Sequence, residues 1–319
     1  MRKGLLTFLL LVACFSYLTA QTTRNASHLV PSGKGWGVPA APGAAPANVN
    51  PDTVHTGNGI NYHGGPVMAG NPVHAYFIWY GNWVNGPHAS DSQTTVNLIN
   101  SLFGSSGGIG GSGYFRINTT YGDNTHDVSG NIALAGSTFN SYSNGTRLSD
   151  ANIRTIVSSA ISSGVLPKDT NGVYFVLTSS DVRETSGFCT QYCGWHTRST
   201  ISGSDIKYSF VGNPDRCSSA CEAQTNSPNG DSGADGMASI MAHEAEEAVT
   251  DPDLNAWYDS QGFEDADKCA WKFGPTTGAI GSGGYNQTFG SHHWLIQMEW
   301  ENARKGGCDQ TLGGAFYNQ

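Results

Sequence analysis

The chain has 319 residues, of which 38% are hydrophobic and 13% are charged, and its formal net charge is −9. This length supports one domain with a sizeable core, or at most two small ones, and we expect one. The acidic balance argues against a protein that binds nucleic acid through a basic surface.

The first 20 residues have the layout of an export signal. Two basic residues precede an apolar run from Gly4 to Ala13, and Leu18-Thr19-Ala20 fits a cleavage site before Gln21. The run is too short to span a membrane, and no other stretch reaches about 18 apolar residues. We therefore expect residues 1–20 to be a signal peptide and the protein to be secreted. A lipoprotein anchor at Cys14 is the minor alternative.

The remainder divides into a leader and a folded part. Residues 21–61 are rich in Pro, Ala, Gly and Asn and have no apolar periodicity, which is typical of a flexible leader. The folded domain is then residues 62–319. Its apolar patterns predict strands at Val73–Trp79, Gly130–Ala135, Val173–Thr178 and Lys207–Val211, and helices at Thr94–Phe103, from Ser149 to about Ser162, and from His292 to about Lys305.

This alternation predicts an α/β (α+β) fold with a mixed β-sheet covered by helices, zincin-like in outline. Removal of the signal peptide leaves six cysteines, and an even number in an oxidising compartment favours up to three disulfides in a single stabilised domain. We expect Cys269 to pair with Cys308, and Cys189, Cys193, Cys217 and Cys221 to pair among themselves. A four-thiolate zinc site is the alternative for those four.

The segment from Ser239 to Pro252 is the most informative part of the chain. We expect a helix that starts with Ser239 as its N-cap and stops before Pro252. Residues four apart on a helix are neighbours, so His243 and Glu247 can converge on one cation while Glu244 lies beside them. The layout copies the H-E-x-x-H helix of zinc peptidases, with Glu247 in place of the second histidine. A solvated acidic face is the plain alternative, but small apolar residues surround these carboxylates.

A catalytic zinc normally takes three protein ligands and one water. The acidic segment Gly262–Cys269 lies about twenty residues downstream, and it offers Asp267 as the first choice of third ligand and Glu264 as the second. Such an acidic loop could instead hold Ca²⁺, although an imidazole ligand favours zinc. His196, which we expect in a loop cross-linked through the nearby cysteines, is a weaker candidate that could stabilise an oxyanion or contribute a ligand.

Several segments in order resemble the EXORDIUM-like family, also called phosphate-induced protein 1. They are Tyr62–Met68, Ile78–Trp83, Val176–Val182, Gly187–Cys189, Cys193–His196, Phe210–Asn213, and the block from His243 to Pro252. The resemblance extends from about Tyr62 to Cys308. It implies a secreted protein associated, in plants, with the cell wall space and with growth responses, and it implies no settled enzyme activity.

Two functions remain open at this point. The first is a secreted zinc hydrolase, most simply a metallopeptidase, in which His243, Glu247 and Asp267 hold the metal and Glu244 is the general base. The second is a non-enzymatic extracellular signalling or cell-wall-binding protein with a structural metal. Both predict an extracellular peptide or a cell-wall component as partner, and neither predicts an oligomeric state.

Overall fold

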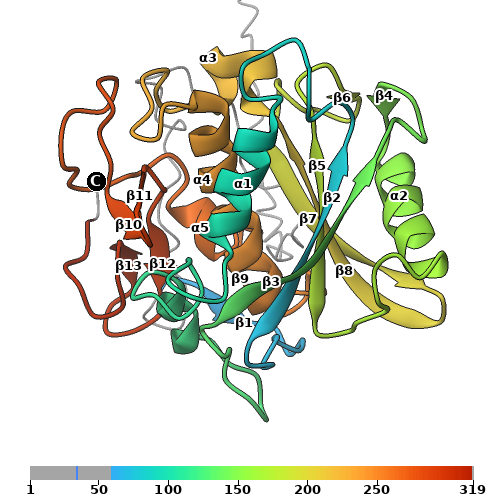
Figure 1. The fold of residues 1–319 in the computed structure, drawn as a ribbon. Coiled ribbons are helices and arrows are strands. Elements are labelled where there is room, and N and C mark those ends of the chain that lie inside the picture. The colour runs from blue at the N-terminus through green and yellow to red at the C-terminus, as the bar shows by residue number, and fades with distance from the viewer. Residues whose placement is uncertain (1–33, 35–58, 318–319) are drawn as a thin grey trace, which may run out of the picture.

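The computed structural model describes residue 34 and residues 59–317. The expected signal peptide, Cys14 and nearly all of the expected leader lie outside these residues. A five-stranded sheet forms the centre of the molecule, in the order β3-β2-β5-β8-β7 (Figure 1). These strands are β2 (Val73–Tyr80), β3 (Ile132–Asn140), β5 (Gly172–Thr178), β7 (Gly194–Ile201) and β8 (Ser204–Gly212).

Four of these strands are parallel, and β7 alone runs antiparallel, as the edge strand beside β8. All seven residues of β5 are buried, as expected for a strand that is covered on both faces. The sheet is therefore mixed, as the sequence predicted. The expected strands at residues 73–79, 173–178 and 207–211 are confirmed, and the expected strand at 130–135 begins at Ile132 and is longer.

Helices cover both faces of the sheet. Figure 1 shows α2 (Asp150–Ser162) on one side, and α1 (Gln93–Leu102) and α4 (Ser232–Thr250) on the other. Ser149 begins α2 with a capping box, in which its side chain accepts from Asn152 N. Helix α2 buries Ile153, Ile156, Val157 and Ile161 at helical spacing. The two helices predicted in this part of the chain are confirmed.

Helix α4 begins earlier than the sequence suggested. Asp231, not Ser239, is its N-cap, and Asp231 Oδ1 accepts a hydrogen bond of 2.9 Å from Ala234 N. Ser239 lies within the helix, where its hydroxyl accepts from Gln297 N at 3.2 Å. The helix ends at Thr250, just before Asp251 and Pro252, as predicted. Sixteen of its 19 residues are buried, so its carboxylates lie in the interior.

The predicted C-terminal helix at residues 292–305 is wrong. The segment instead contributes β11 (His292–Trp294) and β12 (Glu299–Glu301) to two small antiparallel pairs. Every residue from Trp294 to Glu299 is buried, so an extended chain is packed on all sides here, whereas an amphipathic helix would expose one face. The apolar residues at helical spacing therefore do not indicate a helix.

The other elements are short. They are β1 (Asn61–Tyr62) with β9 (Trp257–Tyr258), β4 (Arg147–Leu148) with β6 (Arg183–Glu184), β10 (Gln287–Phe289), β13 (Gly307–Asp309), η1 (Phe115–Thr120), η2 (Pro214–Cys217), α3 (Ser218–Cys221) and α5 (Asp265–Lys268).

Three disulfides join distant segments: Cys189–Cys217, Cys193–Cys221 and Cys269–Cys308. This confirms the pairing of Cys269 with Cys308 and of the other four cysteines among themselves, and it excludes the four-thiolate zinc site. No helix among the described residues combines the length and the apolar character needed to cross a membrane.

Candidate metal centre

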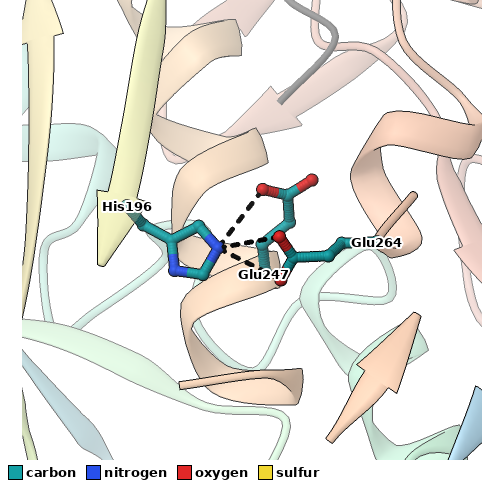
Figure 2. A group of neighbouring side chains, drawn as sticks. All are labelled: His196, Glu247 and Glu264. Atoms are coloured by element: carbon teal, nitrogen blue, oxygen red, sulfur yellow. Dashed lines mark hydrogen bonds and ion pairs between the residues drawn. The ribbon is translucent and has the colours of Figure 1, made fainter. Parts of the chain in front are cut away.

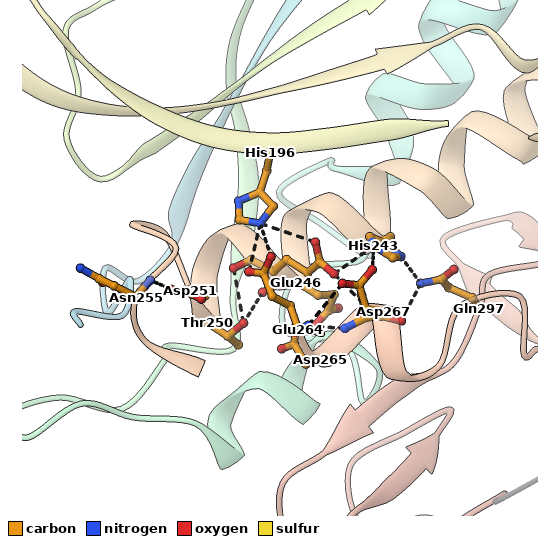
Figure 3. Close-up of polar contacts among 12 residues, drawn as sticks. His196, His243, Glu246, Thr250, Asp251, Asn255, Glu264, Asp265, Asp267 and Gln297 are labelled. Carbon is orange, nitrogen blue, oxygen red and sulfur yellow. Dashed lines mark hydrogen bonds and ion pairs between the residues drawn. The ribbon is translucent and has the colours of Figure 1, made fainter. Parts of the chain in front are cut away.

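The six candidate residues lie together where α4, α5 and β7 meet. His243, Glu244 and Glu247 come from α4, Glu264 and Asp267 from the start of α5, and His196 from the edge strand β7. His196 thus lies on a strand and not in a loop. Figure 3 shows the two histidines on either side of the carboxylates.

The first group consists of His243, Glu247 and Asp267, whose ligand atoms lie within 4.8 Å of one another. His243 Nε2 is 3.0 Å from Glu247 Oε1 and 3.5 Å from Asp267 Oδ1. Ligands bonded to a tetrahedral zinc at about 2.05 Å lie roughly 3.3 Å apart, so both separations fit one zinc ion. The side chains are 8%, 0% and 3% exposed, which keeps bulk water away from the group.

Gln297 holds His243 in this orientation. Its amide nitrogen Nε2 lies 2.5 Å from His243 Nδ1 (Figure 3). A histidine that binds metal through Nε2 carries its proton on Nδ1 and needs an acceptor there. A half-turn of the Gln297 amide exchanges its nitrogen for its oxygen at this position, and the oxygen accepts that proton. No sequence pattern points to this residue, which lies within the segment that is predicted as a helix.

The second group consists of His196, Glu247 and Glu264, also within 4.8 Å of one another (Figure 2). His196 Nε2 is 3.1 Å from Glu264 Oε1 and 3.5 Å from Glu247 Oε2. All three side chains are at most 1% exposed. The structure therefore places the two alternative third ligands in different groups, Asp267 beside His243 and Glu264 beside His196.

The short helix α5 explains why both residues face α4. Glu264 is the N-cap of this helix, and Glu264 N donates a hydrogen bond to Asp267 Oδ2 at 3.3 Å. The two side chains therefore lie close together on the same helical turn. Asp267 N in turn donates to Glu247 Oε1 at 3.2 Å. The nearby disulfide Cys269–Cys308 fixes the end of this turn. The acidic turn is thus positioned by its own backbone and by α4.

Burial raises the pKa values of the carboxyl groups in this centre, and a bound cation would offset that shift. Burial, and then the neighbouring Asp267 carboxylate, raises the pKa of Glu247 to about 8. Burial raises the pKa of Glu264 well above its ordinary value, and Glu247 adds to the effect. Burial also lowers the pKa of His196 to about 3. For His243, burial acts to lower the pKa, but Glu247 and Asp267 outweigh it and raise the pKa well above its ordinary value.

Glu244 belongs to neither group and faces a pocket. The pocket is lined by His243 and Glu244 together with apolar side chains, including Ile240, Trp271, Phe273 and Leu295. Glu244 is 2% exposed, and its Oε2 has no hydrogen-bond partner. Burial raises its pKa well above the ordinary value. A buried carboxylate that has a free oxygen beside a pocket can accept a proton from a bound molecule.

Three further carboxylates, Glu246, Asp265 and Glu299, lie buried nearby and were not singled out from the sequence. Burial raises the pKa of each of them, to about 7 for Asp265. Among the described residues, no group of three metal-ligating side chains within 4.8 Å of one another includes any of them.

Comparison with known proteins places these features in a family. The family model described as the phosphate-induced protein 1 conserved region matches residues 60–293, which include all six candidate residues. Protein EXORDIUM-like 5 of Arabidopsis thaliana is 32% identical over 279 residues, which cover 76% of this chain and 75% of that protein. Protein EXORDIUM-like 3 of the same plant is 32% identical over 282 residues, which cover 76% and 80%. No solved structure matches significantly, so the zincin-like outline stays a prediction.

Proposed function

The chain belongs to the phosphate-induced protein 1 (EXORDIUM-like) family, and we propose that it is a secreted zinc-dependent hydrolase that cleaves peptides. The observation that carries the proposal is the arrangement on α4. His243 and Glu247 face Asp267 at separations that suit zinc, while Glu244 faces the adjoining pocket. Two of the three ligands thus lie on the same helix as the base, which directly follows His243.

The chemistry follows from these positions. A bound zinc would acidify a water molecule and polarise the substrate carbonyl. Glu244 would accept the proton of the attacking water as the water oxygen bonds to the carbonyl carbon. Glu244 would then pass that proton to the amide nitrogen as the carbon–nitrogen bond breaks. The two carboxylate ligands donate more negative charge than imidazoles do, so we expect the highest rate above neutral pH.

The pocket indicates which peptides would bind. Its apolar walls, Ile240, Trp271, Phe273 and Leu295, suit an apolar or aromatic side chain next to the cleaved bond. The disulfide Cys193–Cys221 forms part of the lining and holds β7 against α3. An extracellular peptide substrate accords with the expected signal peptide and with the three disulfides, which form in oxidising compartments.

One observation favours the second candidate function, an extracellular signalling or cell-wall-binding protein with a structural metal. His196 and Glu264 lie against the far side of Glu247. If either one completed the zinc coordination, no position would remain for water, and the site would be structural.

Metal analysis combined with a peptide-cleavage assay tests the proposal. The purified protein should contain zinc, cleave members of a peptide library that have an apolar or aromatic residue next to the scissile bond, lose this activity to 1,10-phenanthroline and regain it with added zinc. Glu244→Gln should keep the zinc and lose at least 100-fold in activity. Glu246→Gln, a buried glutamate on the same helix outside both groups, is the matched control and should keep both. Zinc without any cleavage would support the structural role, and protein without transition metal would refute both.

A further inference from the structure

Glu247 is shared between the two groups, and its two oxygens face in different directions. Oε1 is 3.0 Å from His243 Nε2, whereas Oε2 is 3.5 Å from His196 Nε2. Glu247 is fully buried, and its Oε2 has no hydrogen-bond partner. A buried carboxylate oxygen without a partner costs free energy unless a donor or a cation satisfies it.

A single ion does not account for both groups. No set of three ligand atoms within 4.8 Å of one another, in the part of the chain that the structure describes, contains both histidines. The separations in the second group, 3.1 Å and 3.5 Å, match those in the first and suit a metal ion of the same size. The second group also lies outside the pocket, which is lined by His243 and Glu244 but not by His196 or Glu264.

Charge points to the same conclusion. Four carboxylates, those of Glu244, Glu247, Glu264 and Asp267, surround the two histidines, and each of these side chains is at most 3% exposed. Within the described residues no lysine or arginine forms an ion pair with Glu247 or Glu264. One divalent ion would neutralise only two of the four carboxylates, whereas two ions would balance all four. Buried charges of one sign require such compensation.

We propose that His196, Glu264 and Oε2 of Glu247 bind a second divalent transition-metal ion, and that Glu247 bridges the two ions. One nitrogen and two carboxylate ligands suit zinc or manganese. The second ion would be enclosed by protein and would lie outside the pocket that Glu244 lines, so it would position Glu247 without contacting a substrate in that pocket. The inference rests on the proposed function only in that the first group holds zinc.

The metal content of the purified protein tests this inference. After loading with Zn²⁺ and dialysis against metal-free buffer, the protein should contain two ions per chain. Glu264→Gln and His196→Ala should each contain one ion, and so should His243→Ala, which removes the other site. Glu246→Gln, the matched control, should contain two. A wild-type protein with one ion, or a Glu264→Gln variant that keeps two, would overturn the inference.

A second measurement needs no variant. Stepwise loading of the metal-free wild type with Co²⁺ should show an electron paramagnetic resonance signal that grows up to one equivalent and then weakens towards two, because two ions bridged by a carboxylate couple magnetically. A signal that grows in proportion to the added Co²⁺ and saturates at one equivalent would contradict a bridge between two ions. If the protein binds two ions but cleaves no peptide, this inference stands and the proposed function is refuted. If it binds one ion and cleaves peptides, the proposed function stands and this inference is refuted.

Discussion

Gly194 of the sheet lies directly against Glu244 of helix α4. A β-carbon built on Gly194 would lie 2.9 Å from Glu244 Oε1 and 2.6 Å from Ile240 Cγ2. The backbone oxygen of Phe210, at 3.0 Å, limits movement on the other side. Strand β7 therefore leaves room for the Glu244 carboxylate only because residue 194 has no side chain.

The first prediction follows from this contact. Gly194→Ala should push the Glu244 carboxylate out of place and lower kcat/KM for peptide cleavage about 10- to 100-fold, because a displacement of about 1 Å at a catalytic group has effects of this size. The zinc content should stay unchanged, since Glu244 is not a ligand. Thr200→Ala, at an exposed position on the same strand, is the control and should cleave at the wild-type rate. Equal activity in both variants would show that the position of Glu244 is not critical.

The second prediction concerns the residue behind His243. Gln297→Ala removes the group that orients the imidazole through Nδ1, and it should weaken zinc binding about 10- to 100-fold. A competition titration with a chromogenic chelator measures the affinity. Gln297→Glu keeps an acceptor for the Nδ1 proton and should retain most of the affinity. If both substitutions weakened binding equally, packing would explain the effect better than the hydrogen bond does.

The local geometry of the candidate site was predictable from the sequence, because residues that are close in the chain decide it. His243 and Glu247 are four residues apart on one helix, and Glu264 and Asp267 are three apart on one turn, so each pair had to lie on one face. The central strands and α2 were equally predictable, since their apolar periodicity reports burial directly.

The contacts between residues on different helices and strands were not predictable from the sequence. His196 reaches Glu247 only because β7 is the antiparallel edge strand beside α4, and no pattern near residue 196 carries that information. Likewise, Gln297 reaches His243 because residues 294–299 run extended through the interior, whereas their apolar spacing indicated a helix. Tertiary packing decided both cases.

The third prediction is that the order of thermal stability of wild type and Glu247→Gln reverses between excess zinc and excess EDTA. Glu247→Gln keeps the shape of the side chain but removes its charge, so it should lower metal content and the melting temperature in excess zinc. A ligand present at 1,000 times its Kd stabilises by about 4 kcal/mol, which sets the scale of the loss. In excess EDTA the order should reverse, because wild type must then either protonate Glu247, whose pKa is raised to about 8, or bury its charge beside Asp267 and Glu264. Thermal melts of both proteins in both buffers measure this, and the same order in both buffers would contradict it.

The fourth prediction concerns pH and a carboxyl group outside the metal centre. Glu222 follows Cys221 at the end of α3, and burial, together with the adjacent Asp215, raises its pKa from 4.5 to about 8. Below pH 4.5 the group is protonated in both the folded and the unfolded states and contributes no difference. Between pH 4.5 and 8 the unfolded state releases this proton while the folded state keeps it, so the group lowers the free energy of unfolding as pH rises. Above pH 8 the loss is complete.

Glu222→Gln removes this titration, so its stability relative to wild type should rise steadily between pH 5 and pH 8 and then level off. Urea unfolding of both proteins at pH 5, 6, 7, 8 and 9 gives the difference directly. The candidate metal centre is the same in both proteins, and its own pH dependence therefore cancels in this difference. The value at pH 5 contains whatever the substitution costs in packing, which does not change with pH. A difference that stays flat from pH 5 to pH 9 would mean that Glu222 is ionised in the folded protein throughout, with Asp215 too far away or too well solvated to oppose its charge.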